Sequence, residues 1–500
     1  MAAHEVRKHQ LGVGTRLAHA PSAALVASFG NELRYAHVLY EGLSYADLAH
    51  TLMLIEQAII PAADGRVLLE ALVALHDGGL AAVRLDAKWG DIYNNRDAEL
   101  ERRIGKPAGW LHAGRARREA LTLAWLIHLR SGCHDLVGQA AALVRTIADV
   151  AEQHAGALMP DFTYLQHAHP TTLGHFLLGF AYPVLRDTQR LADTLRYINS
   201  CPAGSASTNG SRLPLNRERL CELLGFAELI VHNRDAMWQS DLPINLMSVL
   251  VSFATTADRL VEELQIWATA EFGFVELADQ HCRTSVIMPN KKNPYVLSFI
   301  RGKARELGGQ LMSVIATNQT PSGQLDNRNA AYELVPAALS TVQGLLTLLS
   351  EVLGAAQFKT ARLRQQADSG FTWATELADL LLQREGVDAR AAHEIVGAVV
   401  AQQCTDQPPP LAASIAGCFR AATGQPIHGP AADLIPELNA ERIVATRTAL
   451  GGCAPDAVRQ MTASLREAME QVVVHNDAAK VATFPALLRG CVSEQLGRTW

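Results

Sequence analysis

The chain has 500 residues, which is enough for two or three hydrophobic cores rather than one. Hydrophobic residues make up 49% of it and charged residues 19%, a composition typical of folded soluble proteins. The formal net charge is −6 and no basic tract is interleaved with aromatic residues, which argues against a nucleic-acid-binding surface.

The eight cysteines are scattered along the chain without a C-x-x-C pair, so neither a zinc site nor a thioredoxin-type site is expected. The N-terminus lacks the charged-then-apolar order of a secretory signal. Apolar stretches such as residues 121–127 are too short to span a bilayer. These features predict a cytoplasmic protein that binds neither membrane nor nucleic acid.

Helical periodicity dominates the sequence, and the alternation typical of strands is scarce. Shorter helices are predicted over residues 1–110, long helices over 111–356, and shorter helices again over 357–500. In the central part the long apolar stripes cover residues 173–198, 244–267, 296–315 and 334–353. Asp241 is predicted to cap the second of these, with Pro243 in its first turn. The prediction is an all-α protein of three domains around a central bundle of long helices, which self-association would complete.

The most informative segment is the loop of residues 285–294, which reads Ser-Val-Ile-Met-Pro-Asn-Lys-Lys-Asn-Pro. Its two prolines and two asparagines cannot continue a helix, yet a helical pattern begins directly after it. A helix N-terminus and neighbouring lysines attract anions. The residues alone leave two interpretations open, a site for a carboxylate or an enolate and a polar surface turn.

The pattern S-x-x-M-P-x-K-x-N-P resembles the signature loop of the fumarase/aspartase superfamily. The resemblance implies that Ser285 is the general base, and that Lys291 and Asn293 steady a doubly charged, enolate-like intermediate. It also makes Met288 of the same loop a residue that contacts substrate. A serine base needs a strongly depressed pKa, which nearby cations and backbone donors can supply.

Within this superfamily the sequence is most similar to the argininosuccinate lyase branch, in collinear order from about residue 30 to 460. That similarity assigns substrate binding to His112, Arg115, Thr163 and Gln166. It implies a homotetramer with one large central bundle and active sites built from three chains, which act on a small carboxylate substrate. The similar segments are residues 112–117, 159–166, 271–277, 300–303, 370–379 and 393–397.

Several positions depart from that pattern on the side of the site that would hold the leaving amine. Tyr164 stands where the branch has histidine, and Ser298 stands where it has the glutamate that pairs with that histidine. Losing both partners together avoids an unpaired charge and indicates rebuilt chemistry. Tyr164 is therefore a candidate catalytic residue, as a proton donor in place of the histidine, with a packed aromatic residue as the alternative.

Further departures affect substrate binding and the loop itself. Ala116 and Arg118 replace a serine and an asparagine that hold substrate, and Thr284 and Val286 replace a glycine and a serine of the loop. Arg118 is predicted to grip an extra carboxylate, with a solvated helix charge as the alternative. Residues 319–332 have no clear counterpart of the segment that grips the arginine moiety.

The functional hypothesis is a carbon–nitrogen lyase that eliminates an amine from an N-substituted amino-dicarboxylate, or adds it to a fumarate-type acid in reverse. Argininosuccinate lyase itself, a lyase that gives another unsaturated acid, and a non-catalytic structural homologue are the alternatives. The histidines at 167, 169 and 175 share no carboxylate at ligand spacing, so we expect neither a metal nor another cofactor.

Overall fold

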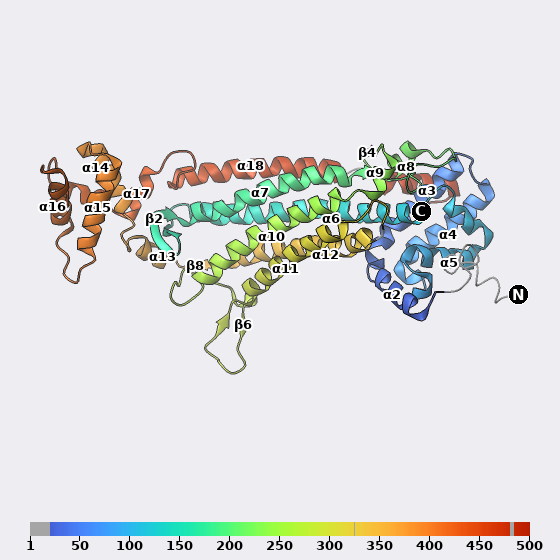
Figure 1. Cartoon of the computed structure of the whole chain (residues 1–500), viewed down its shortest axis with the longest axis horizontal. Coiled ribbons are helices and arrows are strands. Elements are labelled where there is room, and N and C mark those ends of the chain that lie inside the picture. Colours follow the sequence, from blue (N-terminus) through green and yellow to red (C-terminus); the bar gives the residue numbers. More distant parts are fainter. Residues whose placement is uncertain (1–20, 325, 481–484) are drawn as a thin grey trace.

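The computed structural model describes residues 21–324, 326–480 and 485–500. Helices dominate it, and the strands of these residues form four sheets of two short strands each. The all-α fold class is thereby confirmed. The elongated molecule has a bundle of long helices in the middle and groups of shorter helices at both ends (Figure 1).

The N-terminal helices gather at one end of the bundle (Figure 1). The helix α3 is buried on almost every side between residues 42 and 54, and it packs on α6, at the start of the central bundle, and on α4. The helices of this part are α2 (Ala23–Leu33), α3 (Ala36–Glu56), α4 (Ala62–Gly78) and α5 (Ile92–Ile104), with short 3₁₀ turns at Leu80–Ala82, Ala87–Trp89 and Lys106–His112.

Six long helices form the central bundle. Three of them, α6, α10 and α12, run away from the N-terminal helices, and α7, α11 and α18 run back towards them (Figure 1). They comprise α6 (Arg117–Gln153), α7 (Leu173–Ile198), α10 (Asp241–Trp267), α11 (Tyr295–Asn318), α12 (Asp326–Ala355) and α18 (Pro455–Lys480). The α7 helix has the bounds that periodicity predicts, and Thr172 caps it by accepting the His175 N–H at 3.2 Å.

The apolar stripe of α10 lies in the bundle core, as its three-to-four spacing predicts. Leu246, Leu250 and Phe253 on that stripe are fully buried, and each such side chain stabilises the fold by roughly 1.5–3 kcal/mol relative to an exposed one. The predicted cap of this helix is wrong. Asp241 is its first residue, and Ser240 occupies the capping position without a side-chain hydrogen bond.

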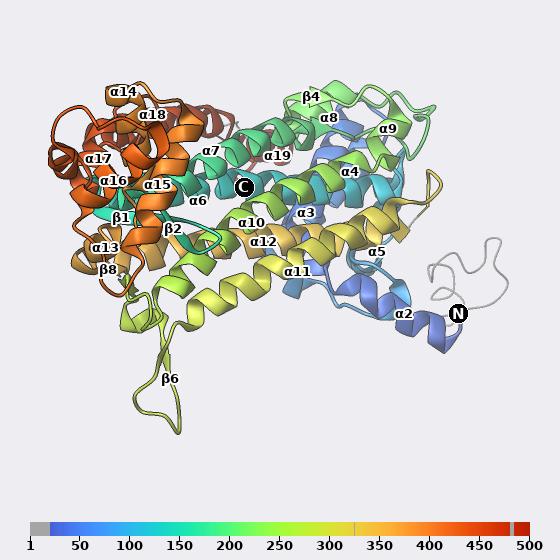
Figure 2. The ribbon, with the colours of Figure 1, turned by 60° about the vertical axis from the view of Figure 1, so that its left-hand side comes forward.

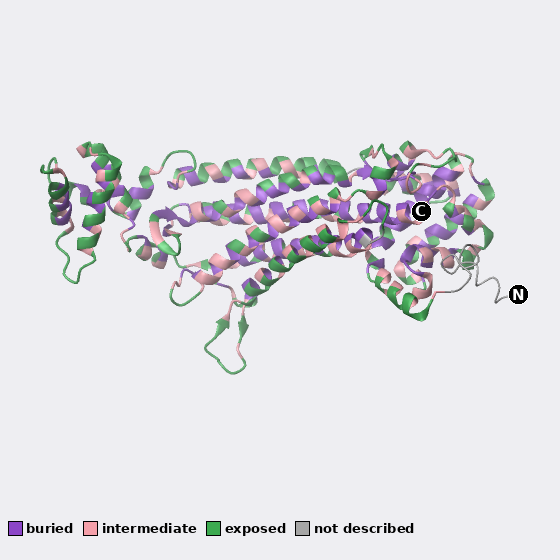
Figure 3. Ribbon diagram, viewed as in Figure 1, coloured by how far each residue is buried: buried purple, intermediate pink, exposed green. Residues whose placement is uncertain are grey.

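Buried residues follow the facing sides of the long helices, whereas exposed residues follow their outer sides (Figure 3). By length and composition alone, α10 and residues Asn327–Ala355 of α12 are apolar enough to cross a membrane. In their most apolar windows, 50% and 44% of the residues are buried inside the molecule, which is the behaviour of helices in the core of a bundle.

The C-terminal part of the chain contributes to the main hydrophobic core and to two smaller clusters of buried residues. Residues between Leu377 and Leu438 form a separate cluster at the far end, whereas α18 packs on α6 and α7, and α19 packs on α3 and α4. The three-part division at residues 110 and 356 stays a prediction. The helices of this part are α13 (Thr360–Ala367), α14 (Ala374–Glu385), α15 (Ala389–Gln403), α16 (Leu411–Thr423), α17 (Ala440–Thr446) and α19 (Ala486–Leu496), with a 3₁₀ turn at Ala431–Glu437.

Two antiparallel hairpins lie at the end of the bundle remote from the N-terminal helices. One pairs β1 (Leu158–Thr163) with β2 (Gln166–Thr172), and the other pairs β6 (Arg283–Thr284) with β7 (Lys292–Asn293). The second hairpin projects well away from the helices (Figure 2). The remaining short elements are β3 (Ser200–Cys201) parallel to β4 (Glu228–Leu229), β5 (Val275–Glu276) antiparallel to β8 (Gln357–Phe358), the helices α8 (Arg217–Leu223) and α9 (Asn233–Trp238), and a 3₁₀ turn at Asp279–His281.

Candidate active site

The predicted serine loop is the tip of the β6–β7 hairpin, and α11 begins two residues after β7 ends. Thr284 pairs with Lys292 across the hairpin, so residues 285–291 form the tip. The Ser285 Oγ accepts the backbone N–H of Met288 at 3.2 Å. A hydrogen bond received by this oxygen favours its anionic form over the neutral hydroxyl.

Apolar side chains at the hairpin tip face solvent in the single chain. Val286 is completely exposed, and Ile287 is 82% exposed. Tyr295 and Phe299 on the first turns of α11 are exposed as well. Exposed apolar side chains of this kind are typical of surfaces that bind a ligand or another protein surface.

The two neighbouring lysines of the loop have different surroundings. Lys292 Nζ forms ion pairs with Asp279 at 2.7 Å and Glu276 at 3.3 Å, and its hydrogen bond to Asp279 raises the pKa of Lys292. The Lys291 ammonium group has no ion pair with any residue that the structure describes. Lys292 therefore anchors the hairpin to the segment before it, whereas Lys291 keeps its charge available for a ligand.

The β1–β2 hairpin carries the predicted residues Thr163, Tyr164 and Gln166 at its tip. Thr163 pairs with Gln166, so Tyr164 and Leu165 form a two-residue turn, with φ angles of +55° and +57°. Such turns favour asparagine and glycine, because a side chain is strained in the left-handed region. Tyr164 is also 99% exposed. A strained and fully exposed aromatic residue is unfavourable for the isolated chain, which is consistent with a functional role.

Replacing Tyr164 with asparagine should separate function from stability. Asparagine suits the first position of this turn, so we expect the free energy of unfolding of Tyr164→Asn to be equal or up to about 1 kcal/mol higher. If Tyr164 donates a proton, kcat should fall about 100-fold or more. Leu165→Gly relieves the same turn and is the matched control, with activity within a few-fold of wild type. Retained activity in Tyr164→Asn would assign Tyr164 to packing alone.

His112 and Arg115 lie at the opposite end of the bundle, before α6, and both have partners within the chain. The His112 ring bonds Tyr93 Oη at 2.8 Å and Asp97 Oδ1 at 2.9 Å. Arg115 is buried, and its Nη2 donates to Asp47 Oδ1 at 2.6 Å. With its guanidinium held by Asp47, Arg115 fixes the loop before α6, and its contact with substrate stays a prediction.

Arg118 lies in the first turn of α6 and forms no ion pair with any side chain that the structure describes. Its Nη2 is buried without a hydrogen-bond partner in the described part of the chain. Its charge lowers the pKa of the Glu32 carboxyl, although burial outweighs that effect and the pKa of Glu32 is raised overall. Arg118 as a whole is half-buried, so both interpretations, a group that grips a carboxylate and a solvated helix charge, stay predictions.

One chain does not bring the predicted residues together. His112, Arg115 and Arg118 precede or begin the 37-residue helix α6, while the hairpin with Tyr164 follows its other end. A helix of this length spans about 55 Å at 1.5 Å per residue. The serine loop projects sideways from the bundle in the half that is remote from the N-terminal helices (Figures 1 and 2). A site that uses both groups therefore needs a second copy of the chain.

Sequence reasoning missed the buried charges that hold the segment around Arg115. Asp47 is 1% exposed and joins Arg115 to Arg96, whose Nη2 lies 2.9 Å from Asp47 Oδ2. Glu119 is also buried and accepts the backbone N–H groups of Gly204 and Ala206, each at 2.7 Å. The only signal for Asp47 in the sequence is a lone carboxylate in the apolar stretch 43–54.

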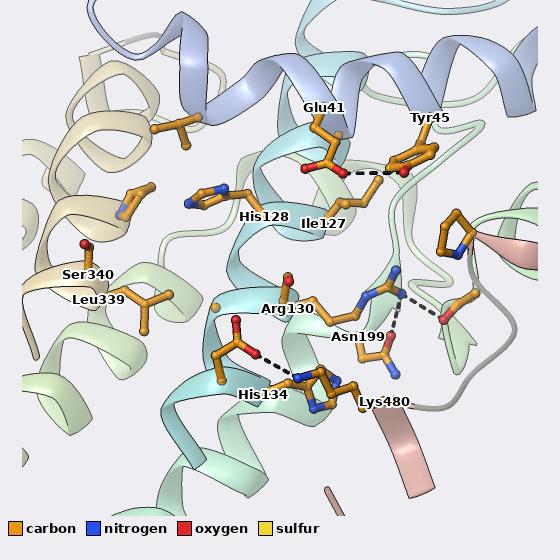
Figure 4. Close-up of a pocket in the computed structure, with 18 of the residues that line it drawn as sticks. Glu41, Tyr45, Ile127, His128, Arg130, His134, Asn199, Leu339, Ser340 and Lys480 are labelled. Atoms are coloured by element: carbon orange, nitrogen blue, oxygen red, sulfur yellow. Dashed lines mark hydrogen bonds and ion pairs between the residues drawn. The ribbon is translucent and has the colours of Figure 1, made fainter. Parts of the chain in front are cut away.

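A cavity of about 600 Å³ opens between α3, α6, α12 and the end of α18 (Figure 4). It contains none of the predicted site residues. Charged groups on its wall have partners, such as Lys480 with Asp135 at 2.8 Å and Arg130 with Asn199 Oδ1 at 3.0 Å. Among the described residues, no cluster of three or more potential metal ligands is found there or elsewhere.

Comparisons with known proteins identify the family to which this fold belongs. Residues 21–309 match the family model described as "Lyase", and residues 371–413 match the model of the argininosuccinate lyase C-terminal region. The argininosuccinate lyase of Methanoculleus marisnigri is 36% identical over 418 residues, 82% of this chain and 84% of that protein. The argininosuccinate lyase of Methanococcoides burtonii is 31% identical over 481 residues, 94% and 96% of the two chains.

Among solved structures, an EDDS lyase in complex with formate superposes with a TM-score of 0.84 at 26% identity and covers 96% of this chain and 97% of its own. The class II fumarase of Schistosoma mansoni has the same fold, with a TM-score of 0.69 at 14% identity and coverage of 86% and 96%. The chain therefore belongs to the argininosuccinate lyase branch of the fumarase/aspartase superfamily and is a carbon–nitrogen lyase.

Proposed function

We propose that this lyase eliminates an amine from an N-substituted amino-dicarboxylate to leave a fumarate-type acid, or adds the amine in the reverse direction, with Ser285 as the general base. The observation that carries this proposal is the hairpin tip, where Ser285 Oγ receives a backbone N–H and lies on the same short loop as the unpaired Lys291. Fumarate bound to a variant of the EDDS lyase supports the class of unsaturated acid.

In the elimination direction, Ser285 Oγ takes the proton from the carbon next to a carboxylate. The electron pair of that C–H bond moves into an enolate-like dianion, which Lys291 and Asn293 stabilise by charge and hydrogen bonding. The C–N bond on the neighbouring carbon then breaks. The nitrogen leaves with the bonding electrons and takes up a proton, for which Tyr164 is the proposed donor.

We propose that the active enzyme is a cytoplasmic homotetramer whose sites are shared between chains. One observation that supports this proposal is that Arg118 and Ser285 are separated by about the length of α6. Another is that Val286 and Tyr164, at the tips of the two hairpins, are exposed to solvent in the single chain. Thr163, Gln166, His112, Arg115 and Met288 are the proposed contacts for the substrate carboxylates. Neither a metal nor another cofactor takes part in these steps.

The two lysines of the hairpin provide an internal comparison. Because Lys291 is proposed to face the dianion, Lys291→Gln should lower kcat by about 10²–10³-fold. Lys292→Gln removes only exposed ion pairs, so activity should stay within about fivefold of wild type. Steady-state kinetics on both variants checks this, and equal effects of the two substitutions would contradict the assignment of Lys291.

A direct test of the function is a screen for fumarate. The protein is incubated with N-succinyl compounds, including argininosuccinate, and released fumarate is followed by its ultraviolet absorbance; fumarate with a panel of amines tests the reverse direction. At least one compound should turn over with wild type and not with Ser285→Ala. If no compound turns over, or if Ser285→Ala matches wild type, the proposal is wrong.

Argininosuccinate lyase itself is a second candidate, favoured by the identity to curated relatives over most of the chain. Tyr164, Ser298 and Arg118 at positions of its amine-side residues weigh against it. Turnover of argininosuccinate in the same screen would decide for it. Both of these candidate functions release fumarate. Mass spectrometry of the product therefore distinguishes them from a lyase that yields another unsaturated acid.

A further inference from the structure

Two cysteines that are twenty residues apart in the sequence, Cys201 and Cys221, come together in the fold as free thiols. Cys201 ends β3, which runs parallel to β4. Cys221 lies on α8, and its thiol donates to Phe226 O at 3.4 Å, in the turn between α8 and β4. The next backbone N–H, that of Ala227, donates to Asn199 O at 3.1 Å. The segment that carries Cys201 therefore lies directly beside the turn that Cys221 contacts.

The two thiol groups contact each other but differ in their surroundings. Cys201 is fully buried, and this burial raises its pKa well above the ordinary value. A hydrogen bond with the Cys201 thiol lowers the pKa of Cys221. The positive charges of Arg130 and Arg217 also lower the pKa of Cys221, against the effect of its burial. Because the thiolate is the nucleophile in cysteine chemistry, Cys221 is the reactive member of the pair.

The two arginines are fixed around the thiol pair by backbone carbonyl groups. Arg130 on α6 donates to Leu224 O at 3.0 Å and to Gly225 O at 2.8 Å, at the end of α8. Arg217, the first residue of α8, donates to Ala203 O at 2.9 Å. Burial lowers the pKa of Arg130 to about 10, so its guanidinium group keeps its charge at neutral pH. Cations that are held in place beside a thiol favour its thiolate form.

The cavity of about 600 Å³ gives small solutes a route towards this thiol pair (Figure 4). Its wall includes Arg130, Asn199 and Gly225, and the hydrogen bond from Arg130 to Asn199 Oδ1 is visible in the figure. Cys221 itself is 8% exposed. A partly accessible thiol in a positively charged environment is typical of cysteines that react with oxidants.

We propose that Cys201 and Cys221 are a redox-active dithiol pair that a hydroperoxide converts into a disulfide. The Cys221 thiolate attacks one oxygen of the peroxide. An S–O bond forms, the O–O bond breaks, and the other oxygen takes up a proton and leaves as water or an alcohol. The Cys201 sulfur then attacks the sulfenic acid, so that the S–S bond forms, the S–O bond breaks, and the oxygen leaves as water with the Cys201 proton. The dithiol loses two electrons and the peroxide gains them.

The test treats the intact protein with hydrogen peroxide, blocks the remaining thiols with iodoacetamide in denaturant, and digests the product with trypsin. Cleavage after arginine places Cys201 in peptide 197–212 and Cys221 in peptide 220–234. These peptides should be joined, and dithiothreitol should release them. Cys404 is the matched control, because it is exposed and accessibility alone would favour its oxidation. Cys221 should nevertheless be oxidised at least about tenfold faster than Cys404.

Single variants separate the roles of the two cysteines. In Cys201→Ser, dimedone should trap a sulfenic acid at Cys221, whereas in Cys221→Ser the Cys201 thiol should stay reduced. Trapping of a sulfenic acid at Cys201 would contradict the order of attack. Oxidation of Cys404 ahead of Cys221, or the absence of joined peptides from treated wild type, would overturn the proposal. These two wild-type measurements decide even if a variant does not fold.

Discussion

Ser285→Ala is expected to lower kcat by roughly 10²–10⁴-fold, the range for loss of a positioned general base. The physical reason is the environment of the Ser285 oxygen, which receives the Met288 N–H and lies on a loop with an unpaired lysine. The substitution removes only one hydroxyl group from an exposed hairpin tip. Its effect on the free energy of unfolding should therefore be within about 0.5 kcal/mol.

The measurement combines fumarate release with exchange of the substrate proton. Wild type should exchange the abstracted hydrogen with deuterium from the solvent, and Ser285→Ala should not. Ser313→Ala is the matched control, because Ser313 is exposed on α11 and bonds only its own helix through Gly309 O at 3.1 Å. Proton exchange at the wild-type rate in Ser285→Ala would assign the base to another residue.

Asp47→Asn is expected to destabilise the fold by about 3–5 kcal/mol, the range for breaking a buried ion pair from one side. Asp47 is the carboxylate between the buried guanidinium groups of Arg96 and Arg115, with contacts at 2.9 and 2.6 Å. Without its charge, two buried cations would face a neutral amide. Denaturant unfolding at a fixed protein concentration measures the change.

Asp97→Asn is the matched control for this prediction. Asp97 also contacts a predicted site residue, His112, at 2.9 Å, but both side chains are partly exposed. The cost of losing such a pair should stay below about 1 kcal/mol. Equal losses in the free energy of unfolding for Asp47→Asn and Asp97→Asn would show that burial does not determine how much the Asp47 ion pairs stabilise the fold.

The hydrophobic periodicity of the sequence was sufficient to predict the long helices of the bundle, but it was insufficient to predict the two hairpins. The long apolar stripes predict α7 from Leu173 to Ile198, because burial of one helix face is a regular signal along the chain. The β6–β7 hairpin has only two residues in each strand, which is too short for alternation to be visible. The turn at Tyr164 has no glycine or asparagine, so the usual signal of a two-residue turn is missing.

For the candidate site, the sequence supplied residue types and the structure supplied their partners. The motif around Ser285 predicts a base, but only three-dimensional contacts distinguish the paired Lys292 from the unpaired Lys291. Trp125 and Arg328 could not be associated with each other from the sequence, because they come to line one pocket through the packing of α6 against α12. Local patterns carry no information on such long-range contacts.

The most direct test of the account is to mix two inactive variants with defects at opposite ends of the bundle. Ser285→Ala removes the base, and Arg118→Glu places a carboxylate where a substrate carboxylate is expected. The two variants are mixed in equal amounts, dissociated and reassembled. Each chain that contributes to a site is then incorporated independently of the other. Roughly one quarter of the sites should therefore have an intact serine loop from one chain and an intact Arg118 from another. Native mass spectrometry confirms that hybrid oligomers have formed. Recovery of about a quarter of wild-type activity is the predicted result, and hybrid oligomers without activity would contradict a site that is shared between chains and contains Ser285.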